Sequence, residues 1–495
     1  MKYIFNHYYK LRNDSKRCYI LSQNNIDCQP QVAISSGWIS VIHPIYAIML
    51  SVFSTPIDLG KACREISELI SIREEEIGAF IKNLIETKEP LHSELGEGVS
   101  GFPVGLIIPE NNAFMPPRLY EAQSFLFKDV DLKRDRPFNA PLSIVIMPTN
   151  KCVTKCAYCY ADTETQYNEM PLSRIKEIVE EAVSLGVGNL ILTGGDIFTY
   201  KNWKELVTFL CEKGYKPDLL STKYPLKKSD IELVKKLGIR VQISLDSLSA
   251  NTQKSMLGVK SQYSVELIKS IKLLDEMHMH YQIATVLTNY NDNIPNLESL
   301  KNFIEKLNNI ERWEVRVGFR SLYSRASFDL IKSKRESIGV VEQWVENVRL
   351  TSKLNILWSP DQDGEYRTEH QGSRFFKGAR CSANMSNMII LPDGKVTICE
   401  QLYWLPEFII GDLSVPNTSI SDVWNSSRAK DLYHFIPKKS FSQSPCSMCK
   451  NKEDCFSYGN RCLADIIKAY GREAWDYPDP RCIHAPQFDH SLCHD

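Results

Sequence analysis

The chain has 495 residues, of which 43% are hydrophobic and 24% are charged, and its net charge is −1. A chain of this length exceeds one hydrophobic core, so the length predicts about two to four domains. The near-neutral charge gives no electrostatic case for nucleic acid or an acidic membrane surface as a partner.

The first residues argue against export and membrane insertion. Residues 1–6 lead directly into polar sequence and lack the apolar core of a signal peptide. The apolar stretch at 38–53 is broken by His43, Pro44 and Ser51, and it is too short to span a bilayer. We therefore expect a cytoplasmic protein with no membrane partner.

Residues 1–95 are predicted to form a small module of their own. Short strands are predicted at 8–11 and 18–21, followed by a helix at 44–52. Two further helices have apolar residues at amphipathic spacing: Ala62, Ile66, Leu69 and Ile70, then Ile77, Phe80, Ile81, Leu84 and Ile85. Residues 96–140 are rich in Gly and Pro and are predicted to be a linker.

From residue 141 to 350, apolar runs alternate with amphipathic helices. Strands are predicted at 143–147, 189–193, 218–222, 240–245, 280–287 and 314–319, and helices at 172–185, 201–213, 229–237, 264–277 and 297–307. This alternation predicts a parallel sheet covered by helices.

Three cysteines follow the first strand of this region. Cys152 and Cys156 are separated by three residues, and Cys156 and Cys159 by two. Three thiolates can bind three irons of a 4Fe–4S cluster and leave the fourth iron open. The alternative is three unrelated buried cysteines, which are common as small hydrophobes. Fifteen cysteines, mostly in clusters, favour metal binding in a reducing cytosol over disulfides.

This spacing resembles the cluster loop of the radical S-adenosylmethionine (SAM) enzymes. The resemblance implies that the open iron chelates the amino and carboxylate groups of SAM, and that cleavage of SAM yields a 5′-deoxyadenosyl radical that abstracts hydrogen. It also implies a partial (β/α)6 barrel, in which chemistry sits at the C-terminal ends of the strands. Tyr158 matches an aromatic residue that lies near the adenine.

Further motifs of that family follow in order. Gly194, Gly195 and Asp196 match a Gly-Gly-Glu-Pro motif, with Asp in place of Glu; glycines let backbone approach the amino group of SAM, and the carboxylate can accept from an ammonium. Ser221 and Ser244 end the third and fourth strands, where relatives contact the ribose or carboxylate of SAM. An Arg that pairs the SAM carboxylate in some relatives has no match at 255–258.

The C-terminal cysteines, in region 351–495, resemble those of the SPASM domain, which carries two auxiliary Fe–S clusters. The resemblance assigns Cys381, Cys399 and Cys462 to a first cluster, and Cys446, Cys449, Cys455 and Cys482 to a second. The loop after Cys455 is longer than in the family. The first cluster lacks a fourth cysteine, so another residue ligates it or one iron is open. A structural zinc site is the alternative for four clustered cysteines.

Glu400 directly follows Cys399, where relatives that oxidise a peptide cysteine or serine carry an Asp as base. A solvated surface Glu is the alternative. The N-terminal pattern resembles the winged-helix, PqqD-like recognition domain of peptide-modifying relatives, which binds a leader peptide as an added strand. A generic helical cap on the barrel is the alternative.

These resemblances together imply a radical SAM–SPASM peptide maturase that installs a thioether or carbon–carbon cross-link. It would use SAM and three 4Fe–4S clusters, a precursor peptide bound through its leader, and a flavodoxin- or ferredoxin-like electron donor. Two alternatives stay open: formylglycine formation on a sulfatase, and a non-catalytic Fe–S electron carrier.

Overall fold

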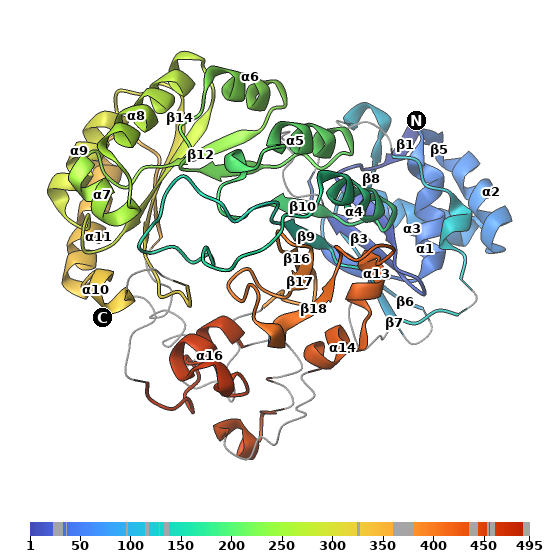
Figure 1. The fold of residues 1–495 in the computed structure, drawn as a ribbon. Coiled ribbons are helices and arrows are strands. Elements are labelled where there is room, and N and C mark those ends of the chain that lie inside the picture. The colour runs from blue at the N-terminus through green and yellow to red at the C-terminus, as the bar shows by residue number, and fades with distance from the viewer. Residues whose placement is uncertain are drawn as a thin grey trace. The chain divides into compact units, whose positions relative to one another are not determined.

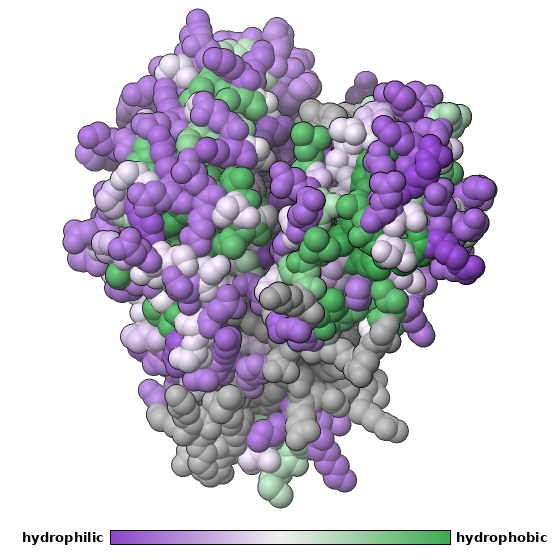
Figure 2. All heavy atoms as spheres, turned by 90° about the vertical axis from the view of Figure 1, so that its right-hand side faces the viewer, coloured by the Kyte–Doolittle hydropathy of each residue, from purple (hydrophilic) through white to green (hydrophobic). Residues whose placement is uncertain are grey.

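In the computed structural model, the described residues are 1–22, 33–35, 37–95, 98–113, 118–127, 129–132, 138–323, 327–359, 381–434, 444–452, 455 and 461–488. The chain divides into two compact units: Met1–Leu142 with Ser184–Gly188, and Ser143–Val183 with Asn189–Asp495. No helix in the described part of the chain is both long and apolar enough to cross a bilayer. Hydrophilic residues predominate on the face drawn in Figure 2.

The first unit combines small antiparallel sheets with three helices. Its elements are β1 (Lys2–Phe5), β2 (Tyr9–Asn13), β3 (Cys18–Ser22), β4 (Ile39–Ile42), α1 (Pro44–Ser51), β5 (Ile57–Asp58), α2 (Leu59–Ile70), α3 (Glu74–Glu86), β6 (Leu91–Leu95), β7 (Gly98–Phe102) and β8 (Ile107–Pro109). Three sheets form, ordered β2-β3-β4, β5-β1-β8 and β6-β7. The strands and helices predicted in residues 1–90 are confirmed, and β1, β4 and β5 are additional.

Local chemistry explains where these helices begin. Helix α2 starts after Asp58, whose carboxylate accepts from the backbone N–H of Gly60 at 2.9 Å and so satisfies a donor that the helix itself cannot. Helix α3 starts with three glutamates, Glu74 to Glu76, which complement the positive end of the helix dipole. The amphipathic spacing then directs Ile66, Ile77 and their neighbours into one buried core.

The stretch predicted as a linker contains regular structure. Strand β7 pairs with β6, and β8 pairs with β1, both antiparallel. Phe102 and Leu106 are fully buried in the core of the first unit. The Gly- and Pro-rich composition conceals these strands because each is short, and the partner of β8 lies about 100 residues away in the chain. The boundaries of the four predicted regions themselves remain a prediction.

The second unit carries the predicted α/β alternation. Its first elements are β9 (Ser143–Ile146), α4 (Leu172–Ser184), β10 (Asn189–Leu192), α5 (Trp203–Glu212), β11 (Leu219–Thr222), α6 (Lys228–Lys236), β12 (Arg240–Ser244), α7 (Ala250–Leu257), α8 (Ser261–Glu276), β13 (Tyr281–Leu287), α9 (Ile294–Ile304), β14 (Ile310–Val317), α10 (Phe328–Ile331), α11 (Arg335–Thr351) and β15 (Ile356–Ser359). All six predicted strands are present, and α8, α9 and α11 lie together on one side of their sheet (Figure 1).

The parallel strands belong to two sheets. Strands β11 to β15 form one all-parallel sheet, and β9 and β10 pair parallel in the other. Within the described residues no backbone pairing joins β10 to β11, so these strands form two sheets and no closed barrel. Strand β15, beyond the predicted end of the barrel, extends the first sheet beside β14.

The C-terminal segment continues the second sheet. Strand β16 (Asn387–Ile390) pairs parallel with β9, and β17 (Lys395–Thr397) and β18 (Ile409–Asp412) follow antiparallel. Helices α13 (Ile420–Trp424), α14 (Ser427–Tyr433) and α16 (Leu463–Tyr470) complete it. This pairing joins the first cluster-loop strand directly to the segment that carries Cys381 and Cys399.

Candidate functional site: a three-cysteine loop over a parallel sheet

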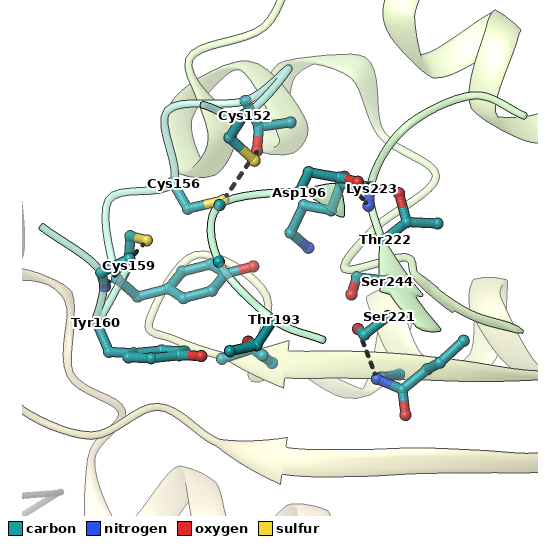
Figure 3. Close-up of a pocket in the computed structure, with 18 of the residues that line it drawn as sticks. Cys152, Cys156, Cys159, Tyr160, Thr193, Asp196, Ser221, Thr222, Lys223 and Ser244 are labelled. Carbon is teal, nitrogen blue, oxygen red and sulfur yellow. Dashed lines mark hydrogen bonds between the residues drawn. The ribbon is translucent and has the colours of Figure 1, made fainter. Parts of the chain in front are cut away.

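Cys152, Cys156 and Cys159 lie on one loop after β9 and line the same pocket. The Thr154 hydroxyl lies 3.6 Å from the sulfur of Cys152 and 3.3 Å from that of Cys156. Figure 3 shows the cysteines along this loop, opposite residues from the ends of neighbouring strands. Three thiols on one loop, with no fourth cysteine beside them in the described pocket lining, fit three irons of a 4Fe–4S cluster.

The loop is held by main-chain hydrogen bonds to the end of α7. The N–H of Lys155 donates to the carbonyl of Leu257 at 2.7 Å, and that of Ala157 to Met256 at 2.8 Å. A helix leaves its last carbonyls without internal partners, so α7 offers acceptors at this place. Gly258 ends the helix with a φ of 62°, the left-handed conformation that glycine adopts without cost.

The glycines after β10 make room for the start of the loop. Gly194 has a φ of 138°, and a Cβ there would lie 2.2 Å from the carbonyl oxygen of Thr149. A Cβ on Gly195 would lie 2.3 Å from the carbonyl oxygen of Lys151. The N–H of Gly195 donates to Thr149 at 3.0 Å. Close approach of the cluster loop therefore requires these two glycines, whatever else they contact.

The carboxylate of Asp196 is already used within the chain. It accepts from the hydroxyl of Thr222 at 2.7 and 2.8 Å, and from the backbone N–H groups of Phe198, Lys223 and Tyr224 at 3.2, 2.9 and 3.1 Å. The residue is 2% exposed. Burial raises the pKa of Asp196, and these donors lower it. The observed bonds tie the end of β10 to the end of β11.

Sequence analysis assigned no role to a buried ion pair that lies beside the loop. Lys223 donates from Nζ to Oδ2 of Asp246 at 2.9 Å, and the Tyr158 hydroxyl donates to the same oxygen at 2.5 Å. The backbone N–H of Val286 donates to Oδ1 at 2.9 Å. Burial raises the pKa of Tyr158. The signal for this ion pair in the sequence was a polar residue directly after β11 and another after β12.

These residues enclose a pocket of about 410 Å³ at the C-terminal ends of the strands. Volumes of this order accommodate small-molecule cofactors. Ser221 and Ser244 line it, and the Gln242 side-chain amide donates to the Ser221 hydroxyl at 3.0 Å. The strand ends place the predicted SAM contacts and the cysteine loop around one cavity, because the carboxyl ends of parallel strands meet at one edge.

The opposite side of the pocket includes Arg316, Phe319 and Glu400. Burial raises the pKa of Glu400, and the negative charge of Glu400 adds to the burial that raises the pKa of Tyr160. Among the described lining residues, Glu400 is the one that follows residue 319 in the chain. Glu400 is therefore partly buried in the pocket lining, and it brings the C-terminal segment to the cavity.

The three cysteines assigned to a first auxiliary cluster lie within electrostatic range of one another. Burial raises the pKa of Cys399 to about 12, with a further rise from Cys381, and Cys399 in turn raises that of Cys462. The N–H of Cys462 donates to Asp479 at 2.8 Å. The stretch at 374–380, which lacks a fourth cysteine in the sequence, lies outside the described residues.

The four cysteines assigned to a second cluster form another group. Burial raises the pKa of Cys446, and Cys482 and Cys449 raise it further. Burial raises the pKa of Cys455 to about 12, while Arg461 lowers it. The long loop after Cys455 lies mostly outside the described residues, at 456–460.

In the described part of the chain, no three His, Cys, Asp or Glu side chains are arranged to hold a single metal ion. Ligation by each group of cysteines stays a prediction.

Comparison with known proteins places this architecture. Residues 146–300 match the radical SAM superfamily, and residues 381–455 match SPASM, an iron-sulfur cluster-binding domain. The chain contains a radical SAM domain and a SPASM domain. The two domains imply Fe–S clusters and SAM as cofactors, and the cysteine groups and the pocket described above fit them.

Relatives include two proteins of Bacillus subtilis (strain 168). The antilisterial bacteriocin subtilosin biosynthesis protein AlbA is 30% identical over 150 residues, 30% of this chain and 33% of AlbA. The sporulation killing factor maturation protein SkfB is 25% identical over 265 residues, 52% of this chain and 60% of SkfB. The chain thus spans a third of one relative and three fifths of the other.

A solved structure shares the fold over nearly the whole chain. Streptococcus suis SuiB bound to its precursor peptide SuiA superposes with a TM-score of 0.64 at 17% identity, covering 98% of this chain and 100% of SuiB. The α/β radical SAM fold with a C-terminal SPASM segment is therefore confirmed.

Proposed function

We propose that the chain is a radical SAM enzyme that abstracts hydrogen from a ribosomally made precursor peptide and installs a thioether or carbon–carbon cross-link. The observation that carries the proposal is one cavity lined both by the three-cysteine loop and by Glu400 of the SPASM segment. Such a cavity allows the residue that loses hydrogen to lie between the two parts. The names of AlbA and SkfB, and the peptide bound to SuiB, support a peptide substrate.

The residues of the pocket have separate roles in this proposal. SAM bound at the loop supplies the 5′-deoxyadenosyl radical when it receives an electron. Gly194, Gly195, Ser221 and Ser244 shape its site, and Tyr158 forms part of the buried floor. Glu400 takes a proton from the substrate as the new bond closes, because a desolvated carboxylate is a stronger base than a solvated one.

In the overall reaction the substrate peptide loses two hydrogens. SAM at the loop would supply the 5′-deoxyadenosyl radical, with methionine as the other product, and this radical would take one hydrogen atom from the substrate carbon. The second hydrogen would leave as a proton to Glu400 and an electron, which a cluster held by the C-terminal cysteines would accept. Cys381, Cys399 and Cys462 hold one such cluster, and Cys446, Cys449, Cys455 and Cys482 hold the other, which makes three clusters in all.

The partners follow from the same proposal. The first unit holds the leader of the precursor at a strand edge, since its short antiparallel sheets leave edge strands to pair with a peptide. The reductant is a flavodoxin- or ferredoxin-like protein in the cytoplasm. Neither nucleic acid nor membrane takes part.

The test compares anaerobically reconstituted wild type with the triple Cys152/Cys156/Cys159→Ala variant. About twelve irons should fall to about eight, and 5′-deoxyadenosine formation should cease. Short peptides encoded beside the gene should lose two hydrogens only with wild type. Iron without SAM cleavage would leave an electron carrier, and an oxidised product without a cross-link would favour formylglycine-type chemistry. About four irons, all lost in the variant, would remove both auxiliary clusters.

A further inference from the structure

The pocket contains a buried ammonium group whose role the proposed function leaves open. Among the described lining residues, the cations are Lys155, Lys223 and Arg316. Lys155 is exposed, and Arg316 pairs with Glu314 at 2.8 Å. The side chain of Lys223 is only 11% exposed. Lys223 is therefore the cation that the pocket most fully removes from water.

The backbone of Lys223 is fixed from two directions. Its N–H donates to Asp196 at 2.9 Å, and its carbonyl accepts from the hydroxyl of Tyr263 at 2.8 Å. Thr222, the preceding residue, donates to the same Asp196 carboxylate. Asp196 thus acts on the position of Lys223, and Figure 3 shows Asp196, Thr222 and Lys223 together at this edge of the pocket.

The ammonium group has more donors than acceptors. A lysine Nζ carries three N–H donors, and within the described residues one carboxylate, that of Asp246, accepts from it at 2.9 Å. That carboxylate also accepts from Tyr158 and from Val286. A buried cation is costly unless charged or polar acceptors surround it. A second anionic acceptor on the pocket side would satisfy the remaining donors.

The cofactor of the proposed function brings such an acceptor. The methionine end of SAM carries one carboxylate and one ammonium, and the adjacent sulfur is a sulfonium cation. The sequence motif predicted that the Asp196 carboxylate accepts from the ammonium of SAM. In the structure this carboxylate already accepts hydrogen bonds from its own chain. Lys223, by contrast, lines the same pocket as Cys152 and Cys156 and lies within electrostatic range of both.

We propose that the ammonium of Lys223 binds the carboxylate of SAM, with Asp246 and Asp196 as the positioning residues that hold it in place. Lys223 then takes the role for which residues 255–258 offer no arginine. The proposal rests on SAM being the cofactor of this pocket. It gives Asp196 a role different from the one that the sequence motif suggests.

The test measures binding, not turnover, on reconstituted holoprotein. Equilibrium dialysis gives the Kd of SAM and of decarboxylated SAM, which lacks the carboxylate alone, for wild type, Lys223→Met and Lys223→Arg. Lys269, which is exposed on α8, supplies the matched control Lys269→Met. A charge-assisted hydrogen bond of this kind corresponds to about 10- to 100-fold in Kd.

Wild type and Lys269→Met should prefer SAM over its decarboxylated analogue by at least that factor, since the carboxylate also chelates the open iron. In Lys223→Met the preference should fall by about that factor, and in Lys223→Arg it should fall by less. Equal binding of both compounds by wild type would overturn the proposal, as would Lys223→Met weakening both compounds equally. Unchanged SAM affinity with an altered cluster midpoint potential would assign Lys223 to the cluster instead.

The same experiment also tests the proposed function, through a different result. Wild type that retains its irons yet binds neither compound would show that the pocket does not take SAM. If Lys223→Met does not retain iron, the change in preference from wild type to Lys223→Arg decides the proposal, because chelation of the open iron by the carboxylate is common to both proteins.

Discussion

The cysteine loop after β9 and the C-terminal cysteine groups are positioned by different forces. Main-chain hydrogen bonds to Met256 and Leu257, and close contact with Gly194 and Gly195, hold the loop. Beside Cys462, whose N–H donates to Asp479, ion pairs hold that carboxylate and its neighbour: Arg481 with Asp479 at 2.7 Å and with Asp465 at 3.3 Å.

The cysteine loop is positioned through its backbone by a helix end and by glycines. These positions tolerate few substitutions but need no charged partner. An ion-pair frame depends on every partner being present, because a charge left alone in a buried site is strongly destabilising. We therefore expect substitutions to disrupt the cysteine loop and the C-terminal cysteine groups by different mechanisms.

The largest effect on SAM cleavage should come from Gly195→Ala. The new Cβ would lie 2.3 Å from the Lys151 carbonyl oxygen and 2.5 Å from that of Asn150, so the start of the loop must move. Overpacking of this kind costs about 1–3 kcal/mol, sometimes more. We expect the loss of about four irons and a lower Tm, measured by iron analysis and thermal unfolding.

Gly339→Ala in α11 is the matched control, because a Cβ there meets nothing within 4 Å. Alanine in a helix interior should raise the free energy of unfolding by about 0.5–1 kcal/mol. Full iron content and an unchanged Tm in Gly195→Ala would show that the glycine contact does not hold the loop.

The next effect should come from Arg481→Met. Asp479 is fully buried, and its carboxylate would lose the guanidinium beside it. Breaking one side of a buried pair costs about 3–5 kcal/mol, and urea unfolding should show the loss. The effect on iron should fall on the auxiliary clusters and spare SAM cleavage.

Arg472→Met provides the contrast. Its pair with Glu407, at 2.7 Å, has side chains 45% and 34% exposed. Exposed pairs contribute at most about 1 kcal/mol. Similar losses in the two variants would contradict the idea that buried ion pairs hold the C-terminal site.

The smallest effect should be a pH-dependent one at Glu400, where the two regions meet at the pocket. Burial raises the pKa of Glu400 above its ordinary value. The carboxyl therefore favours folding most below its unfolded pKa and loses that contribution as pH rises through the folded pKa. Glu400→Gln should match wild type near pH 4.5 and become relatively more stable toward pH 8, measured by urea unfolding of the apoprotein.

Glu407→Gln should behave in the opposite sense. Burial of Glu407 is outweighed by its hydrogen bonds with Arg472, and its pKa is lowered. Its carboxylate contributes stability above the unfolded pKa, and that contribution is lost as pH falls through the folded pKa. Glu407→Gln should therefore be less stable than wild type near pH 8. If the pH profiles of Glu400→Gln and Glu407→Gln ran parallel, burial would not be the cause of the raised pKa of Glu400.

Much of the fold follows from periodicity and spacing, which are local properties of a sequence. The alternation from residue 141 predicted six parallel strands with helices between them, and all six are present. The cysteine triplet predicted a loop after the first strand. Strands β7, β8 and β15 escaped prediction because they are short, and pairing with distant partners stabilises β8 and β15.

The order of residues along the chain specifies which chemical groups are present: three cysteines, two glycines, polar strand ends and seven further cysteines. How those groups are used depends on contacts between distant parts of the fold. Asp196 binds Thr222 and Lys223, 26 and 27 residues away, and Tyr158 binds Asp246 across 88 residues. These contacts depend on which strand ends lie side by side. The residue pattern along one strand does not show which strand lies next to it.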